Sequence, residues 1–455
     1  MVAEVLIFDG HGRQIWSGSE SGSVQAILSI PEAGVSVTAV ADAEVVPRCS
    51  KNDVMRAAEQ LQMVSRRGVP KGFLTTLPAG NVFEESVDAF NMAHLAALDV
   101  NRIDFPLVFD SGGAAMAELI EPYHLQGRTF TLADREGLRL SYAADPNLFA
   151  WLQGRTLAQD LLPYAVYSPQ PVFRNFRTGE LSIQRVRQFT VPDIHILATQ
   201  DSAADRYLHA LELAAESTRF WFDEDYVHVL DSVAGTANDN EEFYARAGKA
   251  AGGITVVRRL PSQSKYYAQK SGVLVWSGYD NVMLYNLQMD DVNPPRFDIR
   301  LDGGGHPTVI HACVAMGMSR MLPLILGRGI SGISRRVIPV ELAPVQVSVV
   351  PLRETHVERA GEIAAQLRNA QIRTTIDADV GRPIGARLAK GNQSWRPFFT
   401  VVGDRELSQQ PLIQDATRTT DAMTPEDFVR LHGERIRRCA AGPLAQDRRL
   451  PFIGD

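Results

Sequence analysis

The hydrophobic positions of residues 339–455 alternate between two periods. Three short apolar runs predict buried strands, at residues 345–350, 372–377 and 398–403. Among them, residues 354–370 repeat apolar side chains at helical spacing, and residues 383–391 predict a second helix that ends at Gly391. Strands that alternate with helices predict a compact α/β domain with a mainly parallel sheet.

A different pattern, in residues 171–200, predicts two antiparallel strands joined by a charged loop. The strands are expected at residues 173–176 and 185–197, with Thr178-Gly179-Glu180 as the turn signal. Four side chains carry the chemistry of this hairpin: Arg174, Arg185, Phe189 and His195. Arginines can hold phosphate groups and an aromatic ring can stack on a base, so these side chains predict an ATP site that is not a P-loop.

Less regular patterns fill the rest of the chain. Residues 1–48 contain hairpin and strand patterns, including a strand at 35–40, and predict a small β-rich unit. Apolar positions at helical spacing predict a helix within residues 51–66, and residues 81–110 predict a long helix followed by a strand that carries Pro106. We therefore expect three domains, at residues 1–48, 49–338 and 339–455.

Composition places the chain among ordinary globular proteins. Its 455 residues suffice for two or three domains, and 45% hydrophobic with 22% charged residues argues against disorder. A net charge of −7 gives no overall attraction to nucleic acid. DNA is therefore not expected as a partner, and any RNA contact needs a local basic face.

The cysteines and the start of the chain bear on the compartment. Cys49, Cys313 and Cys439 are far apart and form no CxxC pair, so neither a disulfide framework nor a cysteine-rich zinc site is expected. The chain begins without a basic and apolar leader, and it has no apolar run of about 18 residues. These features predict a soluble cytoplasmic protein without a membrane partner.

The strings FRNF and RVRQFTVPDIHI resemble motif 2 of class II aminoacyl-tRNA synthetases, and the second string is most similar to that of threonyl-tRNA synthetase. The resemblance implies that Arg174 binds the α-phosphate of ATP and the amino-acid carboxylate. It also implies that Arg185 reaches the terminal phosphate and that Phe189 stacks on adenine. Phe176 departs from the pattern, because the family has a glutamate there that helps to hold adenine.

Two more segments carry the same resemblance. Residues 307–322 are similar to motif 3, in which an arginine, here Arg320, packs over adenine and touches the terminal phosphate. An unpaired buried arginine is costly, so Arg320 either meets an anion or lies on an exposed face. Gln288 matches a glutamine on the strand beneath the nucleotide, and residues 81–110 match the motif 1 element that builds the family's dimer interface.

The resemblance implies an α+β fold, with an antiparallel class II catalytic sheet followed by a three-layer α/β domain. Residues 342–351, 384–388 and 397–406 are similar to the anticodon-binding domain of threonyl, prolyl, histidyl and glycyl enzymes. The implied ligands are ATP, Mg²⁺ and an amino acid. A homodimer is implied as well, and tRNA is an acceptor that the sequence leaves open.

A metal site is also implied by the resemblance, because threonyl enzymes hold one zinc with a cysteine and two histidines. His195 and His311 match the two histidines, and Asp145 stands where the cysteine should be. Two histidines and a carboxylate are an acceptable open site for Zn²⁺. The alternative is that the metal is lost with the cysteine and that both histidines are structural; His306 is a nearby spare.

The amino-acid pocket is expected to be altered. Asp193 matches the aspartate that accepts the threonine hydroxyl, and Tyr267 matches an aromatic residue that contacts the amino group. Asn286 replaces a threonine in the pocket wall. The resemblance therefore implies threonine or a related β-hydroxy amino acid as the substrate.

Other departures affect the acceptor. No two histidines have the HxxxH spacing of the family's editing domain, so editing is not expected. Glu406 is kept in the anticodon-binding-like domain, but Gly381 stands near an asparagine that reads the anticodon, and Gln414 or Asp415 stands where an arginine should be. Three hypotheses follow: a threonyl-type tRNA ligase without editing, a paralogue that passes the activated amino acid to another acceptor, and a non-catalytic regulatory protein.

Overall fold

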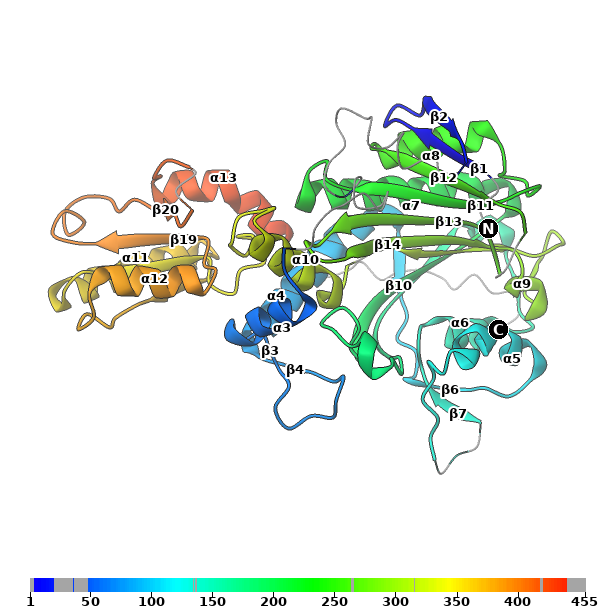
Figure 1. Ribbon diagram of the computed structural model, residues 1–455, viewed down its shortest axis with the longest axis horizontal. Coiled ribbons are helices and arrows are strands. Elements are labelled where there is room, and N and C mark those ends of the chain that lie inside the picture. Colours follow the sequence, from blue (N-terminus) through cyan, green and yellow to red (C-terminus); the bar gives the residue numbers. More distant parts are fainter. Residues whose placement is uncertain are drawn as a thin grey trace.

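The computed structural model describes residues 4–19, 36, 48–133, 135, 137–262, 266–314, 316–417 and 420–439. A large sheet dominates the first two thirds of this chain, and a small α/β domain lies beside it (Figure 1). The strand expected at residues 35–40 lies outside the described residues except for Ser36.

The large sheet has ten strands in the order β2-β1-β12-β11-β13-β14-β16-β10-β9-β5. Their bounds are β1 Glu4–Phe8, β2 Gln14–Gly18, β5 Val100–Arg102, β9 Tyr164–Phe173, β10 Gln188–Ala198, β11 Val227–Val233, β12 Thr255–Leu260, β13 Tyr267–Trp276, β14 Asn281–Asp290 and β16 Thr308–Cys313. All neighbouring pairs are antiparallel except β11 with β12 and β5 with β9.

Long helices cover one face of this sheet. Helix α7 (Gln200–Phe222) packs on β10, β13, β14 and β16, and α10 (Met318–Ser331) packs on β10, β13 and β14. Three further helices flank them: α3 (Lys51–Gln60), α4 (Pro78–Leu95) and α8 (Glu241–Ala251). Alternate strand residues, such as Ile194 and Ile196, enter the apolar core on this side, which leaves the intervening side chains on the other face.

The remaining elements surround the free face. The strands form three short pairs: β3 (Val64–Ser65) with β4 (Thr75–Thr76), β6 (Val108–Asp110) with β7 (Leu138–Leu140), and β8 (Thr156–Leu157) with β15 (Arg300–Leu301). Helices α5 (Ala114–Leu125) and α6 (Asp145–Leu152), with Phe297 directly after α9 (Asn293–Arg296), build a second apolar cluster with β9, β10 and β16. This cluster encloses one side of the cavity described below.

The C-terminal domain has a four-stranded sheet in the order β18-β17-β19-β20. Its strands are β17 Val347–Pro351, β18 Thr374–Ile376, β19 Phe398–Val402 and β20 Gln414–Asp415, and its helices are α11 Val357–Asn369, α12 Ile384–Gln393 and α13 Pro425–Arg438. Strand β17 pairs in parallel with both β18 and β19. The predicted fold class, an antiparallel sheet followed by an α/β domain, is confirmed.

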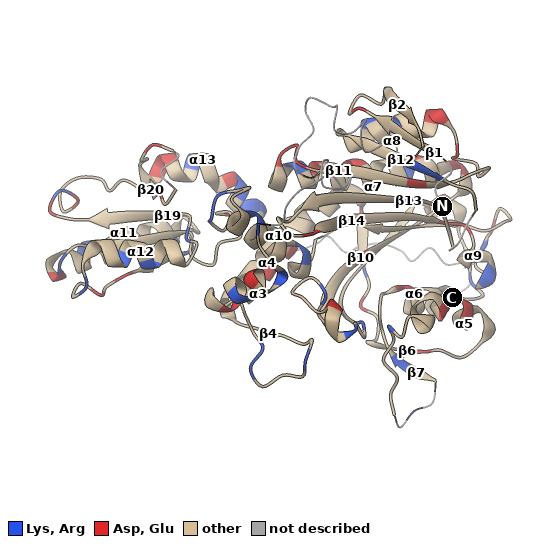
Figure 2. Cartoon of the chain, in the orientation of Figure 1, with Lys and Arg blue, Asp and Glu red and all other residues tan. Residues whose placement is uncertain are grey.

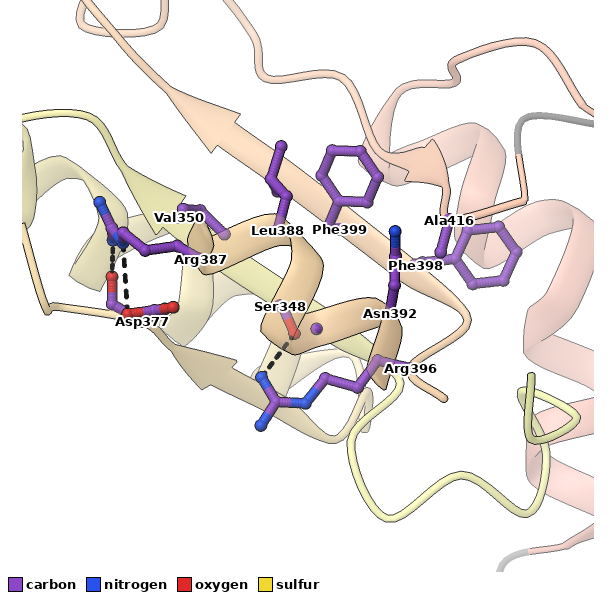
Figure 3. A pocket seen from close by; sticks show the side chains of 11 residues that line it. Ser348, Val350, Asp377, Arg387, Leu388, Asn392, Arg396, Phe398, Phe399 and Ala416 are labelled. Carbon is purple, nitrogen blue, oxygen red and sulfur yellow. Dashed lines mark hydrogen bonds and ion pairs between the residues drawn. The ribbon is translucent and has the colours of Figure 1, made fainter. Parts of the chain in front are cut away.

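Three layers are visible in this domain. Val347 and Val349 of β17 pack with α11 and α13, whereas Ser348 and Val350 face α12. Figure 3 shows the α12 side, where Arg387 pairs with the Asp377 carboxylate at 3.4 Å and Arg396 donates to Ser348. The space left there is about 20 Å³, enough for little more than one water molecule.

The C-terminal domain is tied to the large sheet through α13. Arg435 pairs with Glu341 at 2.6 Å, donates to the carbonyl of Phe220 in α7, and lies over the Phe220 ring. Basic and acidic residues are interspersed over both domains (Figure 2). No helix in the described ranges is long and apolar enough to cross a lipid bilayer.

Several sequence expectations need correction. Of the β-rich unit expected at residues 1–48, the described residues 4–19 join the large sheet, because β1 pairs with β12 and extends its edge. The helix expected within 51–66 ends at Gln60, since Val64–Ser65 pair with β4. Pro106 lies between β5 and β6 rather than in a strand. These differences arise from pairing with distant segments, which local periodicity does not report.

A buried hydrogen-bond network crosses the sheet beneath α7. His228 on β11 contacts Thr255 Oγ1 through Nδ1 at 3.0 Å and Ser271 Oγ through Nε2 at 2.7 Å, and Tyr207 donates to the same serine. All four residues are buried. Burial lowers the pKa of His228 from 6.5 to about 3, so the ring stays neutral in the folded protein at neutral pH.

We expect this histidine to make folding less favourable in mild acid. The unfolded chain takes up a proton near pH 6.5, whereas the folded chain does so only near pH 3, so stability is lost as the pH falls below 6.5. His228→Gln removes this linkage. Between pH 7 and pH 5, urea titrations should show the wild type losing about 2 kcal/mol more than the variant. Equal losses in both proteins would contradict the assignment.

Candidate active site

A cavity of about 290 Å³ opens on the face of the large sheet that the long helices leave free. Its floor comes from three adjacent strands, β14, β16 and β10. Helix α5, the start of α6 and the start of α10 supply its walls, with Tyr123, Asp145 and Arg320. Most of the candidate residues from the sequence meet here.

Strand register explains why these residues meet. His195 lies opposite His311, Gln288 lies opposite His311 on the other side, and Asn286 lies opposite Cys313. In each strand the candidates are two residues apart, so they share the cavity face. Asp193 precedes His195 by two residues and lines the same space.

Asp145, His195 and His311 form a compact group of potential metal ligands, with donor atoms all within 4.8 Å of one another. The Asp145 Oδ1 atom lies 2.9 Å from His311 Nδ1 and 3.8 Å from His195 Nε2. Asp290 accepts a hydrogen bond from His311 Nε2 at 3.0 Å. His306, the spare candidate, contacts the carbonyl of Ile299 and is not a member of the group.

The electrostatics of this group are strongly coupled. Burial alone would lower the pKa of His311, but the Asp145 and Asp290 carboxylates outweigh it and raise the pKa to about 10. Burial opposes ionisation of Asp145 too, yet His311 and His195 hold the pKa of that carboxyl well below its usual range. Without an ion, His311 is therefore an imidazolium between two carboxylates, and a bound cation would take the place of the proton on Nδ1.

The donor set fits a divalent metal ion. Two imidazole nitrogens and one carboxylate oxygen point at one space and leave positions open for substrate or water. His311 donates its second nitrogen to a carboxylate, as metal-bound histidines generally do. The Nε2 atom of His195 is the nitrogen available to an ion, because it lies 3.8 Å from Asp145 Oδ1, whereas Nδ1 is buried and has no hydrogen-bond partner among the described residues.

Asp193 lies deeper in the cavity and is buried. Its Oδ2 accepts from the backbone N–H of Ala144 at 3.1 Å, and its Oδ1 accepts from the Cys313 thiol at 3.0 Å. Burial raises the pKa of Asp193, and the negative charge of Asp145 adds to the effect. This carboxyl is thus placed to accept a hydrogen bond from a polar group of a small ligand.

Two arginines line the cavity without a carboxylate partner. Arg174 follows β9 directly and donates through Nε to the carbonyl of Tyr142, and its guanidinium lies over the rings of Tyr123 and Phe189. The guanidinium of Arg320, in the first turn of α10, has no hydrogen-bond or ion-pair partner among the described residues. Burial lowers the pKa of Arg320 to about 10, and the nearby charges of Arg174 and Arg185 add to this shift.

Arg185 completes this cationic group from the loop between β9 and β10. It is half exposed and lies 3.9 Å from Glu180. The charges of Arg174 and Arg185 both lower the pKa of Arg320, so the three arginines expected to bind a triphosphate lie near one another, although Arg185 itself does not line the cavity. Their mutual repulsion favours an anionic ligand such as a phosphate. Gly317 brings α10 close to β10, since a Cβ atom there would lie 2.8 Å from the carbonyl oxygen of Thr190.

The loop that carries Arg185 is held by a bidentate ion pair. Arg128 donates to both oxygens of Glu180 at 2.8 and 2.7 Å, and hydrogen bonds from Arg128 and Arg177 lower the pKa of Glu180 to about 2. Arg128 also lies over the Phe176 ring at 4.9 Å. Phe176, which stands where the family has a glutamate, therefore packs its ring against Arg128.

The structure separates one predicted residue from the cavity. Tyr266 lines it and donates to Gln288 at 2.6 Å, whereas its neighbour Tyr267 pairs with Asp290 at the end of β13 and does not line it. Sequence reasoning also missed Tyr123 and Lys270, which line the cavity. Tyr123 carries no local signal because α5 folds over from a distant segment.

Cys313 was also missed as a pocket residue. Its spacing of two from His311 on the same strand could have placed it on the cavity face. Asn286 lines the same cavity, and its buried Oδ1 has no hydrogen-bond partner among the described residues. The amide is therefore free to accept a hydrogen bond from a bound ligand.

In the C-terminal domain, the altered positions are occupied by internal contacts. Asp415 is buried, accepts from Thr417, and pairs with Arg335 at 3.4 Å. Glu406 accepts from the backbone N–H of Gly403, and Gly381 is exposed in the loop after β18. The Asp415 and Glu406 carboxylates are therefore already engaged by other residues of the chain.

Comparison with known sequences finds related proteins over most of the chain. Residues 346–431 match the family model described as an anticodon binding domain. The chain is 25% identical over 385 residues to a threonine–tRNA ligase of Methanosphaerula palustris, and 23% identical over 352 residues to one of Pyrococcus horikoshii. The first alignment covers 82% of this chain and 61% of the relative, so the chain spans about six-tenths of the length of such relatives.

Solved structures show the same fold. The RNA binding domain of threonyl-tRNA synthetase from Cryptosporidium parvum matches with a TM-score of 0.68 at 18% identity, over 84% of this chain and 98% of that one. Prolyl-tRNA synthetase from Giardia lamblia, solved with prolyl-adenylate, matches with a TM-score of 0.66 at 16% identity, over 87% and 82%.

Proposed function

We propose that this threonyl-tRNA synthetase-like chain, which has the class II synthetase fold, joins an amino acid to AMP at the expense of ATP. The observation that carries the proposal is the pair of arginines, Arg174 and Arg320, that line one cavity with no carboxylate partner in the described chain. They lie beside a second group of polar residues, Asp193, Asn286 and Gln288, that suits a small zwitterion.

The reaction needs no protein nucleophile. A carboxylate oxygen of the amino acid attacks the α-phosphorus of ATP, the bond to the bridging oxygen of the β-phosphate breaks, and pyrophosphate leaves; Mg²⁺ bound with ATP would neutralise part of the phosphate charge. Arg174 would neutralise charge that develops at the α-phosphate, while Arg320 and Arg185 would hold the terminal phosphates. Phe189 would stack on the base.

For the amino acid we propose threonine or a related β-hydroxy acid. Asp193 would accept a hydrogen bond from the side-chain hydroxyl, and Asn286 would line the same pocket. Tyr266 takes the place first proposed for Tyr267. Asp145, His195 and His311 would hold Zn²⁺, which when bound supplies a Lewis acid that orients the polar groups of the substrate.

The acceptor is proposed to be tRNA, in line with the anticodon-binding-like domain. One alternative has specific support: Phe176 packs under Arg128, and Asp415 is engaged with Arg335 where an arginine would face RNA. These contacts favour a paralogue that passes the activated amino acid to another acceptor. A homodimer, a cytoplasmic location and the absence of editing stay predictions from the sequence.

Two assays test the proposal. ATP–pyrophosphate exchange across a panel of amino acids should show exchange, strongest with threonine or another β-hydroxy acid. No exchange with any acid would support the third hypothesis, a non-catalytic protein. Charging of total tRNA then decides the acceptor: exchange without acylated tRNA would favour the alternative paralogue.

A further inference from the structure

Asp290, the last residue of β14, is a fully buried carboxylate with four hydrogen bonds. Its Oδ1 accepts from the backbone N–H groups of Val292 and Asn293 at 3.0 and 2.9 Å. Its Oδ2 accepts from the Asn293 amide at 2.6 Å and from His311 Nε2 at 3.0 Å. The carboxylate is therefore fixed before any ligand arrives.

Only one nitrogen of His311 can then serve a cation. Both oxygens of Asp290 already accept from N–H groups of Val292 and Asn293, so in the contact with His311 the carboxylate is again the acceptor and Nε2 carries the hydrogen. The other nitrogen, Nδ1, faces Asp145 at 2.9 Å, on the side of His195. We propose that Asp290 is a positioning residue that sets the tautomer and orientation of His311 for a divalent metal ion. This inference rests on the metal site of the proposed function.

The two histidines differ in this respect. His195 Nδ1 is buried and has no hydrogen-bond partner in the described chain, so nothing comparable fixes that ring. His311 is also opposite Gln288 in the strand register, and its ring lies 5.2 Å from that of Tyr266. Asp290 is therefore the residue that fixes the His311 ring, and substituting it should change metal binding specifically.

Asp290→Asn tests the tautomer while preserving the shape. The amide oxygen would keep the two backbone N–H bonds, which turns the NH₂ group toward His311 Nε2. That nitrogen must then accept, and the ring proton moves to Nδ1, where the cation should bind. We expect the affinity for Zn²⁺, and for Co²⁺ as a spectroscopic probe, to fall by about 10- to 100-fold in titrations of metal-free protein. The visible Co²⁺ absorption should also change.

Asn293→Ala is the matched control, because it removes a bond to the same carboxylate but leaves the His311 contact. Its metal affinity should stay close to that of the wild type. Equal affinity in Asp290→Asn and the wild type would overturn the inference and leave the metal site standing. A wild type that binds neither ion would overturn the metal site itself, whatever the result of the exchange assay.

A measurement on the wild type guards against misfolding of the variant. Nitrogen-15 NMR of the histidine rings in the metal-loaded protein should show His311 with a proton on Nε2 and a metal-bound Nδ1. A proton on Nδ1 of His311 would overturn the inference without any substitution.

Discussion

Arg174→Ala is expected to reduce ATP–pyrophosphate exchange by about a thousandfold, with any amino acid that the wild type activates. The guanidinium lies in a cavity where two arginines have no carboxylate partner among the described residues, so its charge is available to the reacting phosphate. Arginines that stabilise charge in phosphoryl transfer contribute about 10³- to 10⁵-fold. The loss should appear in the rate constant for exchange, because the interaction strengthens as charge develops.

Two variants make this result interpretable. Arg174→Lys keeps a positive charge but lacks the planar fork, and should recover only part of the activity. Arg246→Ala removes an arginine of α8 whose partner, Asp205, is exposed on the far side of the molecule, and should leave the exchange rate unchanged. An Arg174→Ala variant that is folded and as active as the wild type would refute the assignment of the phosphate site.

Asp145→Ala is expected to abolish stoichiometric metal. The carboxylate is the link between His195 and His311, and its loss leaves two imidazoles, one of them hydrogen-bonded to Asp290. Because one of three ligands is removed, metal affinity should fall by more than the roughly 100-fold typical of changes outside the ligand set. Elemental analysis of protein purified without added zinc measures the metal content of each variant.

The control for Asp145→Ala is Asp201→Ala, which also removes a carboxylate from the first turn of a helix, but on an exposed surface. It should keep its metal. Asp145→Cys should restore binding and, with a softer ligand, shift preference further toward Zn²⁺. The alternative is that His195 and His311 are structural and bind no metal. Wild-type protein without metal, together with an unchanged rate of ATP–pyrophosphate exchange in Asp145→Ala, would support it.

Several site residues were accessible from the sequence because their spacing is set locally. Asp193 and His195, like Asn286 and Gln288, are two apart in a strand, and a period of two places both members of each pair on one face wherever the strand lies. The prediction was wrong by one residue at the start of β13. Tyr266 and Lys270, four residues apart, line the cavity, whereas Tyr267 does not.

The amino-acid pattern by itself predicted three strands and two helices of the C-terminal domain, and the motifs that carry the family resemblance supplied the candidate cationic and metal-ligating side chains. These depend on backbone periodicity and on side-chain chemistry, which short stretches of chain already contain. Only the tertiary structure decided that β1 extends the large sheet, that Tyr123 closes the cavity from α5, and that Asp290 orients His311. Each of these contacts joins residues brought together by strand pairing or packing, and no local pattern encodes such an encounter.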